Sequence, residues 1–455
     1  MASGRQFRFL LTSFCVSTLI AHTKQQCTVI KPVSLPLTNC TVRQPDGSDI
    51  ESWGVLVGLG SPRQELCLIP STVVSNPLLM GSELCVGDNL NGSTPEQCAS
   101  RRGGLIDTSS EDFSFVGLPI DKANLTSDRV WARIMKPFQP YKVAGTVDLD
   151  LKHNLRLENL TVAVITEGQK HNVGHLGLGP NSTVLAGLIS QGVIHDKGFG
   201  LNAGSQSYDK PRPGSLVLGG YDKANVIGAF REYPMNRSSD DRNCPLQLNI
   251  VRLALRRPGQ EDVDLSPRGV IIPSCIEPYD NLFRMLPYVL DDFRQNTGWS
   301  NDTVVPNDLY VVEPGLLYPS NVGFDGSLVF SIEDGWDVEV PNEELQHPLR
   351  GLDAEGQMQL RNNTTEVNVF AERALLDKAV LGKAFLSQVY LAVDYKRGVF
   401  MLAPLLPDAQ GSDLVPFSSD SASCPSGKAG INKGLLIGLI VAPKWFAKQQ
   451  VADLK

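Results

Sequence analysis

The sequence lacks several features that would indicate common classes of ligand. Its formal net charge is −8 and it contains no basic block, so a nucleic-acid partner, which needs concentrated positive charge, is not expected. It has six His and no Cys-x-x-Cys pair, which argues against structural zinc. Because no third glycine or helix follows its Gly-x-Gly turn, a nucleotide loop is also excluded. We therefore expect neither a metal nor a cofactor.

Helical periodicity is scarce as well. The chain contains 41 Gly and 30 Pro, which favour turns and short strands over long helices. His171 and His175 lie in a segment that reads as a strand, where their spacing places them about 13 Å apart on one face. That separation is too large for easy chelation of one metal ion.

The N-terminal segment is typical of a secretory signal. Arg5 and Arg8 precede an apolar run from Phe9 to Ala21, and this run is too short to span a bilayer comfortably. We expect residues 1–22 to be a signal peptide and the mature chain to be secreted or displayed at the cell surface.

Two further patterns agree with export. Cysteines are even in number once Cys15 in the signal is set aside, which indicates disulfides; they are Cys27, Cys40, Cys67, Cys85, Cys98, Cys244, Cys275 and Cys424. Nine Asn-x-Ser/Thr sequons predict glycans on surface loops, with only one expected at the adjacent last pair; they are Asn39, Asn91, Asn124, Asn159, Asn181, Asn236, Asn301, Asn362 and Asn363.

The C-terminal part changes in composition near residue 410. We read residues 407–433 as a Ser-rich, flexible stalk. Residues 434–455 contain the apolar stretch GLLIGLIVA followed by a polar tail. This stretch is shorter than the roughly 20 residues that cross a hydrocarbon core. A shortened membrane anchor and a plain disordered tail both remain open, and membrane association is expected only through this segment.

Between these ends lie an N-terminal extension, residues 23–50, and a long region of short apolar or alternating segments separated by Gly, Pro and Asn. Helical spacing is seen at 281–297 and 374–386. Many short strands with few helices predict an all-β, sandwich-like or barrel-like architecture. The predicted strands include 53–60, 65–70, 145–151, 160–165, 214–221, 389–395 and 398–404.

Four segments carry a recognisable pattern in a fixed order. Residues 53–69 contain the turn Gly-Leu-Gly-Ser-Pro-Arg-Gln, residues 173–180 read VGHLGLGP, and residues 198–222 contain PGSLVLGGYD. Residues 380–404 contain Leu-Gly-Lys-Ala-Phe-Leu from position 381 and continue into a Tyr-x-x-x-Asp strand. Together these segments resemble the pepsin-like aspartic peptidase family, particularly its fungal extracellular branch. The resemblance implies a bilobal all-β acid-protease fold with a central cleft for peptides, its lobes at 51–224 and 225–406.

The family's chemistry needs two aspartates that share one proton across the cleft, each in an Asp-Thr/Ser-Gly turn. Carrying the first turn across from Gln64 without gaps places Ser71 at the aspartate position, Thr72 at the threonine and Val73 at the glycine. Serine supplies no acidity near neutral pH, and no His can be placed beside Ser71 to activate it. The first catalytic aspartate is therefore expected to be missing.

The second turn is also degenerate. Residues 270–287 resemble the family's second motif region, and counting back from Leu286-Pro287 places Pro278 at the aspartate position. Glu277 lies one residue earlier and would supply one carboxylate if the turn were shifted. Asp280 lies two residues later, and an ordinary loop acid is the alternative reading of both.

Two other features could be mistaken for catalytic elements. Asp107-Thr108-Ser109 spells part of the motif but lacks its glycine and a preceding apolar strand, so we interpret it as a surface loop. The family's flap pairs Tyr with Gly, whereas here Tyr141 is followed by Lys142. Tyr141 is expected to pack on a hairpin.

The resemblance also implies disulfide pairings. Cys85 and Cys98 match the family's small loop bridge after the first motif strand. Cys244 and Cys275 are expected to link within the second lobe. Cys27 is expected to pair with either Cys40 or Cys67.

Two functions from different classes remain. The leading hypothesis is a secreted or cell-surface homologue without the catalytic dyad, a pseudoenzyme whose cleft takes peptides or protein segments. The alternative is a weak or atypical aspartic-type endopeptidase that uses Glu277.

Overall fold

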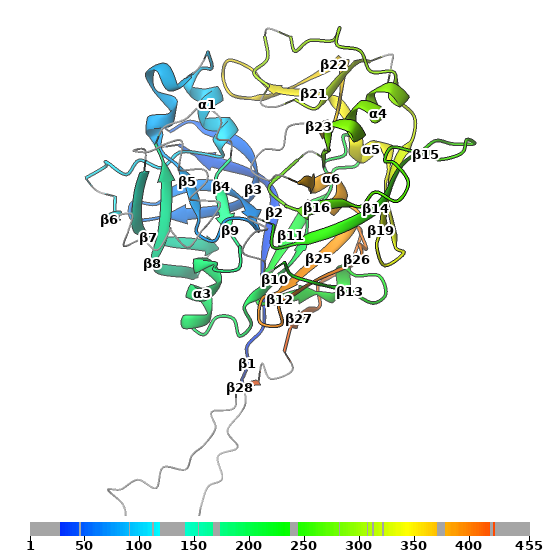
Figure 1. Ribbon diagram of the computed structural model, residues 1–455. Coiled ribbons are helices and arrows are strands. Elements are labelled where there is room, and N and C mark those ends of the chain that lie inside the picture. Colours follow the sequence, from blue (N-terminus) through cyan, green and yellow to red (C-terminus); the bar gives the residue numbers. More distant parts are fainter. Residues whose placement is uncertain are drawn as a thin grey trace, which may run out of the picture. The chain divides into compact units, whose positions relative to one another are not determined.

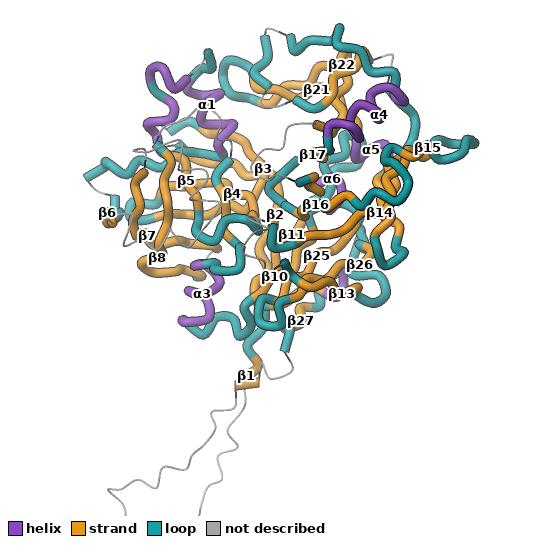
Figure 2. Tube along the Cα trace, in the orientation of Figure 1, coloured by secondary structure: helices purple, strands orange, loops and turns teal. Residues whose placement is uncertain are grey.

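The computed structural model describes residues 28–423, except for 45–46, 91, 112, 119–141, 153, 167–172, 237–243, 282, 307, 312–313, 321–322, 371–377 and 419–421. The chain forms two units, one made of its ends, Met1–Val29 with Ala422–Lys455, and one made of Ile30–Ser421. In the first unit, β1 (Thr28–Val29) pairs antiparallel with β28 (Ala422–Ser423). The second unit, called the body, carries the elements described below (Figures 1 and 2).

An antiparallel sheet joins the two halves of the body, in the order β13-β26-β25-β10-β11-β2. Strands β10 and β25 come from different halves of the chain and pair directly, with Gly200 opposite Ala392. Backbone hydrogen bonds therefore tie the halves together. The strands are β2 (Val33–Arg43), β10 (Gly198–Asn202), β11 (Gly214–Leu218), β13 (Arg231–Pro234), β25 (Val389–Asp394) and β26 (Val399–Pro404).

The first lobe continues this sheet with longer hairpins. Its strands are β3 (Asp49–Leu59), β4 (Gln64–Ser71), β5 (Leu78–Met80), β6 (Val116–Leu118), β7 (Lys142–Lys152), β8 (Leu155–Ile165) and β9 (His175–Gly177). Its helical elements are η1 (Ser82–Cys85), η2 (Gly87–Leu90), α1 (Pro95–Arg102) and α3 (Thr183–Ser190). A small ribbon of β12 (Gly220–Asp222) and β27 (Leu414–Pro416) follows it, with the turn η5 (Lys223–Asn225).

The second lobe has a sheet of its own and a smaller sheet at its edge. The main sheet comprises β14 (Gln247–Arg256), β15 (Val263–Asp264), β16 (Ile272–Ile276), β17 (Phe283–Arg284), β19 (Ser327–Ile332), β20 (Asp337–Val340), β23 (Val369–Phe370) and β24 (Ala379–Leu381). The smaller one comprises β18 (Leu316–Pro319), β21 (Gln346–Leu352) and β22 (Met358–Val367). The helices are α4 (Pro287–Thr297), α5 (Asn342–Leu345) and α6 (Lys383–Leu386).

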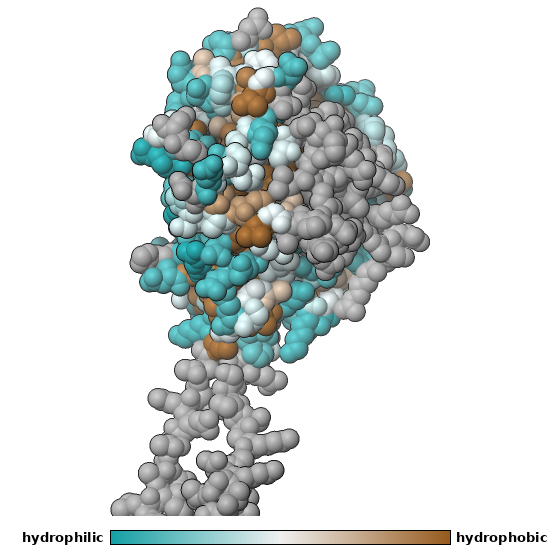
Figure 3. All heavy atoms as spheres, turned by 90° about the vertical axis from the view of Figure 1, so that its left-hand side faces the viewer, coloured by the Kyte–Doolittle hydropathy of each residue, from teal (hydrophilic) through white to brown (hydrophobic). Residues whose placement is uncertain are grey.

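Alternating burial explains the strands that face solvent on one side. In β2, Leu35 and Leu37 are buried on either side of the exposed Pro36, the period of two that a half-buried strand requires. Strand β25 is buried along its whole length, as expected for a strand covered on both faces. On the face of the body shown in Figure 3, hydrophilic and hydrophobic residues are interspersed.

The two lobes repeat one pattern of strand pairing. In the first lobe, β4 runs parallel to β9, β9 antiparallel to β5, and β5 parallel to β8. In the second lobe, β16, β24, β17 and β23 repeat these three relations in the same order. His175 pairs with both neighbours of β9, and Val380 with both neighbours of β24. The expectation of an all-β fold with two lobes is confirmed.

Helices were predicted less well than strands. Helix α4 begins only at Pro287, because residues 283–284 form β17 and proline favours the first helical position. The segment 374–386 contains strand β24 and the short helix α6 rather than a continuous helix. Helix α1 was missed, although Thr94 and Gln97 form a capping box at its start that is readable from sequence.

The N-terminal extension is part of the folded body. Residues 33–43, which were assigned to an extension outside the lobes, form β2 and pair with both β3 and β11. The correction follows from the alternating apolar residues of this segment, which need a partner surface. No helix in the described ranges is long and apolar enough to cross a membrane.

Three disulfides lie within the body. The structure contains the Cys85–Cys98 and Cys244–Cys275 bonds that the resemblance implies. Cys40 is bonded to Cys67, so the expected pairing of Cys27 with either of them is wrong, because adjacent strands β2, β3 and β4 bring those two sulfurs together. Cys27 and Cys424 lie outside the described residues.

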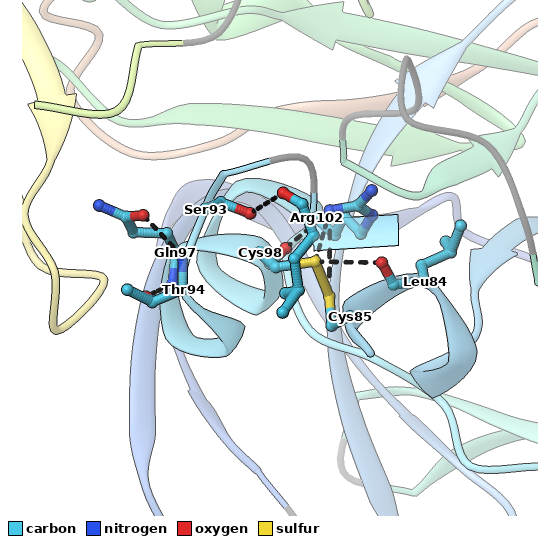
Figure 4. Close-up of a disulfide and its surroundings, with 8 residues drawn as sticks. Leu84, Cys85, Ser93, Thr94, Gln97, Cys98 and Arg102 are labelled. Carbon is cyan, nitrogen blue, oxygen red and sulfur yellow. Dashed lines mark hydrogen bonds between the residues drawn. A yellow bond between two sulfur atoms is a disulfide. The ribbon is translucent and has the colours of Figure 1, made fainter. Parts of the chain in front are cut away.

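Removing the Cys85–Cys98 bond should lower stability measurably. The bond closes a short loop that holds η1 against α1, as Figure 4 shows. The double variant Cys85→Ser/Cys98→Ser is expected to lose about 2–4 kcal/mol of unfolding free energy, mainly because the unfolded chain regains freedom. Chemical denaturation measures the loss, and non-reducing peptide mapping of the secreted protein tests the pairing. Free thiols at both positions would refute it.

Candidate functional site

Ser71, to which the sequence resemblance assigns the first aspartate position, ends β4. Its side chain is fully buried, and it pairs with Gly177 on the parallel strand β9. The Leu178 amide donates a 2.9 Å hydrogen bond to the Ser71 carbonyl. A Cβ at position 177 would lie 2.5 Å from the backbone of Asn76. The Leu-Gly sequence here therefore permits the close approach of β9 to the turn that follows Ser71.

Glu277 occupies the corresponding point of the second lobe. The repeat pairs Ile276 with Leu381, and the Glu277 amide then donates a 3.2 Å hydrogen bond to the Leu381 carbonyl. This register places Glu277 opposite Gly382, as Ser71 lies opposite Gly177.

The second motif is therefore shifted by one residue from the gapless count. Glu277 is the counterpart of Ser71, and Pro278 is the counterpart of Thr72. The count that placed Pro278 at the aspartate position is wrong, because the segment from β16 to Leu286-Pro287 is one residue longer than that count assumed.

The Glu277 carboxylate contacts the first lobe directly. Its Oε2 accepts hydrogen bonds from the Thr72 amide at 3.1 Å and the Thr72 hydroxyl at 2.7 Å. Its Oε1 accepts one from the Tyr279 amide at 3.1 Å. The Thr72 hydroxyl also lies 3.2 Å from the Ile276 carbonyl oxygen. Both carboxylate oxygens are thus occupied by donors, and the side chain links the two lobes.

Burial sets the protonation of this carboxylate. Glu277 is 4% exposed, and burial raises its pKa to about 7, although the hydrogen bonds from Thr72 and Tyr279 act in the opposite direction. Near neutral pH, the group is therefore divided between its protonated and ionised forms.

Large side chains stand two residues after Ser71 and two residues after Glu277. Val73 stands in the first turn and Tyr279 in the second. The Tyr279 hydroxyl donates to the Val173 carbonyl at 3.0 Å. Its ring stacks on His175 with centroids 3.7 Å apart. Tyr279 therefore reaches across to the first lobe from the turn that follows Glu277.

A second tyrosine joins the lobes beside the same centre. The Tyr395 hydroxyl donates a hydrogen bond to the carbonyl of Leu178. Burial raises the pKa of Tyr395 well above its usual value, and the charge of Glu277 acts in the same direction. Tyr395 is therefore a neutral hydrogen-bond donor at physiological pH.

The Asp280 carboxylate does not pair with Glu277 to form a dyad. It forms an ion pair with Arg284, and both side chains are buried. Its backbone carbonyl accepts a 2.8 Å hydrogen bond from the amide of Lys383. Burial lowers the pKa of Lys383 to about 7, and the charge of Asp280 partly offsets that effect.

The loop Asp107-Thr108-Ser109, which spells part of the motif, has a structural role. The Asp107 carboxylate accepts hydrogen bonds from the amide and hydroxyl of Ser109 at 2.9 and 2.7 Å. The Asp107 backbone exchanges two hydrogen bonds with the Gln64 side chain. This loop therefore braces the first hairpin. Tyr141 of the expected flap lies outside the described residues.

The remaining site predictions concern metals and glycans. No cluster of three or more metal-binding side chains occurs in the part of the chain that the structure describes, and His171 lies outside it. Among the sequon asparagines, Asn91 and Asn124 are also outside the described residues, and Asn236 is half-buried. The exposed ones are Asn39, Asn159, Asn181, Asn301, Asn362 and Asn363.

The centre holds one carboxylate where proton sharing needs two. Proton sharing between like charges is what allows one acid to activate water while the other stays protonated. Ser71 supplies a hydroxyl at the first position, and Thr72 and Tyr279 occupy the oxygens of Glu277. In chemical terms, this arrangement is suited to hydrogen bonding between lobes.

Three residues of this centre were not found by motif reasoning. Tyr279 was not readable as a motif position, because the gapless count placed Pro278 at the aspartate and therefore Asp280 at the glycine. Tyr395 and Lys383 lie far from the motif in sequence, and only the parallel pairing of β16 with β24 and the sheet between the halves bring them close.

Comparison with known proteins gives a structural similarity. No protein-family model matches the chain, and no curated protein matches it. Among solved structures, the chain is similar to the aspartic proteinase from Irpex lacteus, with a TM-score of 0.49 and 16% identity over 84% of this chain and 100% of that one. The fold and centre described above follow from this chain's own strand pairing and contacts.

Proposed function

We propose that this protein is a non-catalytic, exported homologue of pepsin-like aspartic peptidases. In this proposal the two lobes form a scaffold for binding, and the residues around Ser71 and Glu277 connect the lobes. A peptide or a segment of another protein, held in the cleft that the resemblance implies, is the proposed partner.

One observation carries this proposal. The Glu277 carboxylate faces the amide and hydroxyl of Thr72, and Ser71 stands where a second carboxylate would be needed. Without that second group, no proton is shared and no water-activating charge is held against an acid. Enzymes commonly gain about 8–23 kcal/mol of barrier reduction, so little of it is expected to remain.

A second candidate is an atypical acid peptidase centred on Glu277. The observation in its favour is the pKa of about 7 for this buried carboxyl, since catalytic acids are often perturbed in this direction. Such an enzyme would use Glu277 together with a second acid that the sequence does not locate.

A cleavage assay distinguishes the two. The purified secreted chain, Ser71→Ala and Glu277→Gln are each incubated with a peptide library between about pH 3 and pH 6, the range expected for the family. We expect no turnover by any of them. If the parent cleaves and Glu277→Gln abolishes cleavage, the proposal is wrong and the atypical peptidase replaces it.

Export is proposed together with this function. The three disulfides are compatible with an oxidising compartment. We expect a product that lacks the first 20-odd residues and is heavier than its polypeptide mass, because six sequon asparagines in described ranges are exposed. Mass spectrometry before and after deglycosylation measures both, and an unmodified cytosolic chain that retains Met1 would contradict export.

A further inference from the structure

The two ends of the chain each carry one cysteine that the disulfides of the body leave over. Eight cysteines remain once Cys15 in the signal is set aside, and the three bonds within the body use six of them. The two left over are Cys27 and Cys424. An even number of cysteines in an exported chain indicates a complete set of disulfides, and within one chain these two have only each other.

Strands β1 and β28 set the register of the two ends (Figure 1). They pair antiparallel, with Thr28 of β1 opposite Ser423 of β28. In an antiparallel ladder, a step toward the N-terminus on one strand is matched by a step toward the C-terminus on the other. The next pair in this register is therefore Cys27 opposite Cys424. Both cysteines lie just beyond the described residues, so the pairing is inferred from the register of their neighbours.

The distance between opposite residues suits a disulfide. Residues directly opposite each other in an antiparallel ladder have Cα atoms about 4.5–5.5 Å apart. The Cα atoms of bonded cysteines usually lie about 4.4–6.8 Å apart, and those of the three bonds in the body lie 5.6 to 6.0 Å apart. Opposite residues also place their side chains on the same face of the ladder. Two cysteines at one cross-strand position can therefore bond without a shift of the backbone.

The ladder between the ends is too short to be stable by its hydrogen bonds alone. Each strand contributes two residues, and an isolated two-stranded ribbon is at best marginally stable in water. A covalent bond at the adjacent position would hold the two strands together.

We propose that Cys27 and Cys424 form a fourth disulfide, which joins the N-terminal segment to the C-terminal segment. The bond forms by exchange with a disulfide oxidant of the secretory compartment. One cysteine thiolate attacks the oxidant, and the second then displaces the oxidant's sulfur from the mixed disulfide. The two cysteines lose two protons and two electrons, and the oxidant's disulfide becomes two thiols. This inference rests on the proposed export but not on the absence of catalysis.

The bond would give the C-terminal segment a second covalent connection to the body. Without it, one cut between β27 and β28 separates the body from the tail that contains GLLIGLIVA. With it, the tail stays joined through Cys27 and the residues that lead into β2. A body attached to a surface through this tail would therefore not be released by a single cut in that stretch.

Cyanogen bromide cleavage of the secreted protein tests the pairing. The reagent cuts after methionine in acid, where the thiolates needed for disulfide exchange are scarce. Fragment 402–455 contains Cys424 as its only cysteine. The variant Ile30→Met, at a half-buried position between β1 and β2, adds a cut that leaves Cys27 alone in the fragment ending at residue 30. We expect mass spectrometry without reductant to find these two fragments linked, and reductant to separate them.

Two variants in the Ile30→Met background are the controls. Cys27→Ser should release fragment 402–455 without reductant, with Cys424 as a free thiol. Cys85→Ser/Cys98→Ser loses a disulfide of the body instead, and it should keep the two fragments linked.

The outcomes that contradict the inference are distinct from those that contradict export. Fragment 402–455 found free, or linked to fragment 31–80, would overturn the fourth disulfide while the Cys85–Cys98 bond in fragment 81–135 still supports export. Free thiols at all eight positions would overturn both. A doubled intact mass without reductant would place the two cysteines on different chains and would also overturn the inference.

Discussion

Ser71→Asp is expected to produce a protein that is much less stable at pH 8 than at pH 4 and that still fails to cleave peptides. Residue 71 is fully buried, and the pKa of Glu277 beside it is already raised to about 7. Two neighbouring buried carboxyls cannot both ionise, so the second ionisation of the pair has a folded-state pKa well above the unfolded value. Stability is then fully present at low pH and lost as pH rises. We expect a loss on the order of 4 kcal/mol between pH 4 and pH 8.

Ser71→Asn is the control for size and polarity without charge. It should show no additional pH dependence relative to the parent in chemical denaturation at the two pH values. Identical pH profiles for the Asp and Asn variants would mean that residue 71 does not face Glu277. Adding Val73→Gly to Ser71→Asp should also leave cleavage absent, because Tyr279 still fills the second turn.

Glu277→Gln should remove a pH dependence that the parent shows. The folded-state pKa of Glu277 is raised from 4.5 to about 7, so its contribution to stability is fully present below pH 4.5 and is lost as pH rises through 7. The difference in unfolding free energy between parent and variant should therefore fall by about 3 kcal/mol from pH 4.5 to pH 8.5. Chemical denaturation across this range measures it.

Two further variants sharpen this test. Glu51→Gln changes an exposed carboxylate on β3, and we expect its curve to run parallel to that of the parent. Thr72→Val removes the 2.7 Å hydroxyl donor to Glu277, so the pKa of Glu277 should rise further and the loss of stability should extend to higher pH. A parent whose stability does not change between pH 4.5 and pH 8.5 would show that Glu277 is not buried in this setting.

Strand positions were readable from the sequence because their signal is local. The alternation in 53–60 and the apolar run in 389–395 record how each strand contacts its neighbours, and both segments lie in strands. Residues 33–43 belong to a polar, proline-containing segment, and this composition predicts an extension rather than a strand. Their role in the sheet depends on β3 and β11, which no local pattern reveals.

The first motif position was also available from the sequence, because Gln64 and Ser71 lie on one continuous hairpin strand and a count between them needs no gap. The count to the second motif crossed the loop between β16 and α4, where one extra residue shifts the result. Parallel pairing with β24 determined that Glu277, rather than Pro278, is the counterpart of Ser71.

By itself the sequence determined the absence of an Asp-Thr/Ser-Gly turn at either motif, since a missing residue type needs no coordinates. Only the tertiary structure decided what replaces the dyad. Thr72 and Glu277 are far apart in sequence, and a hydrogen bond between them exists only because the two lobes present their turns to one another.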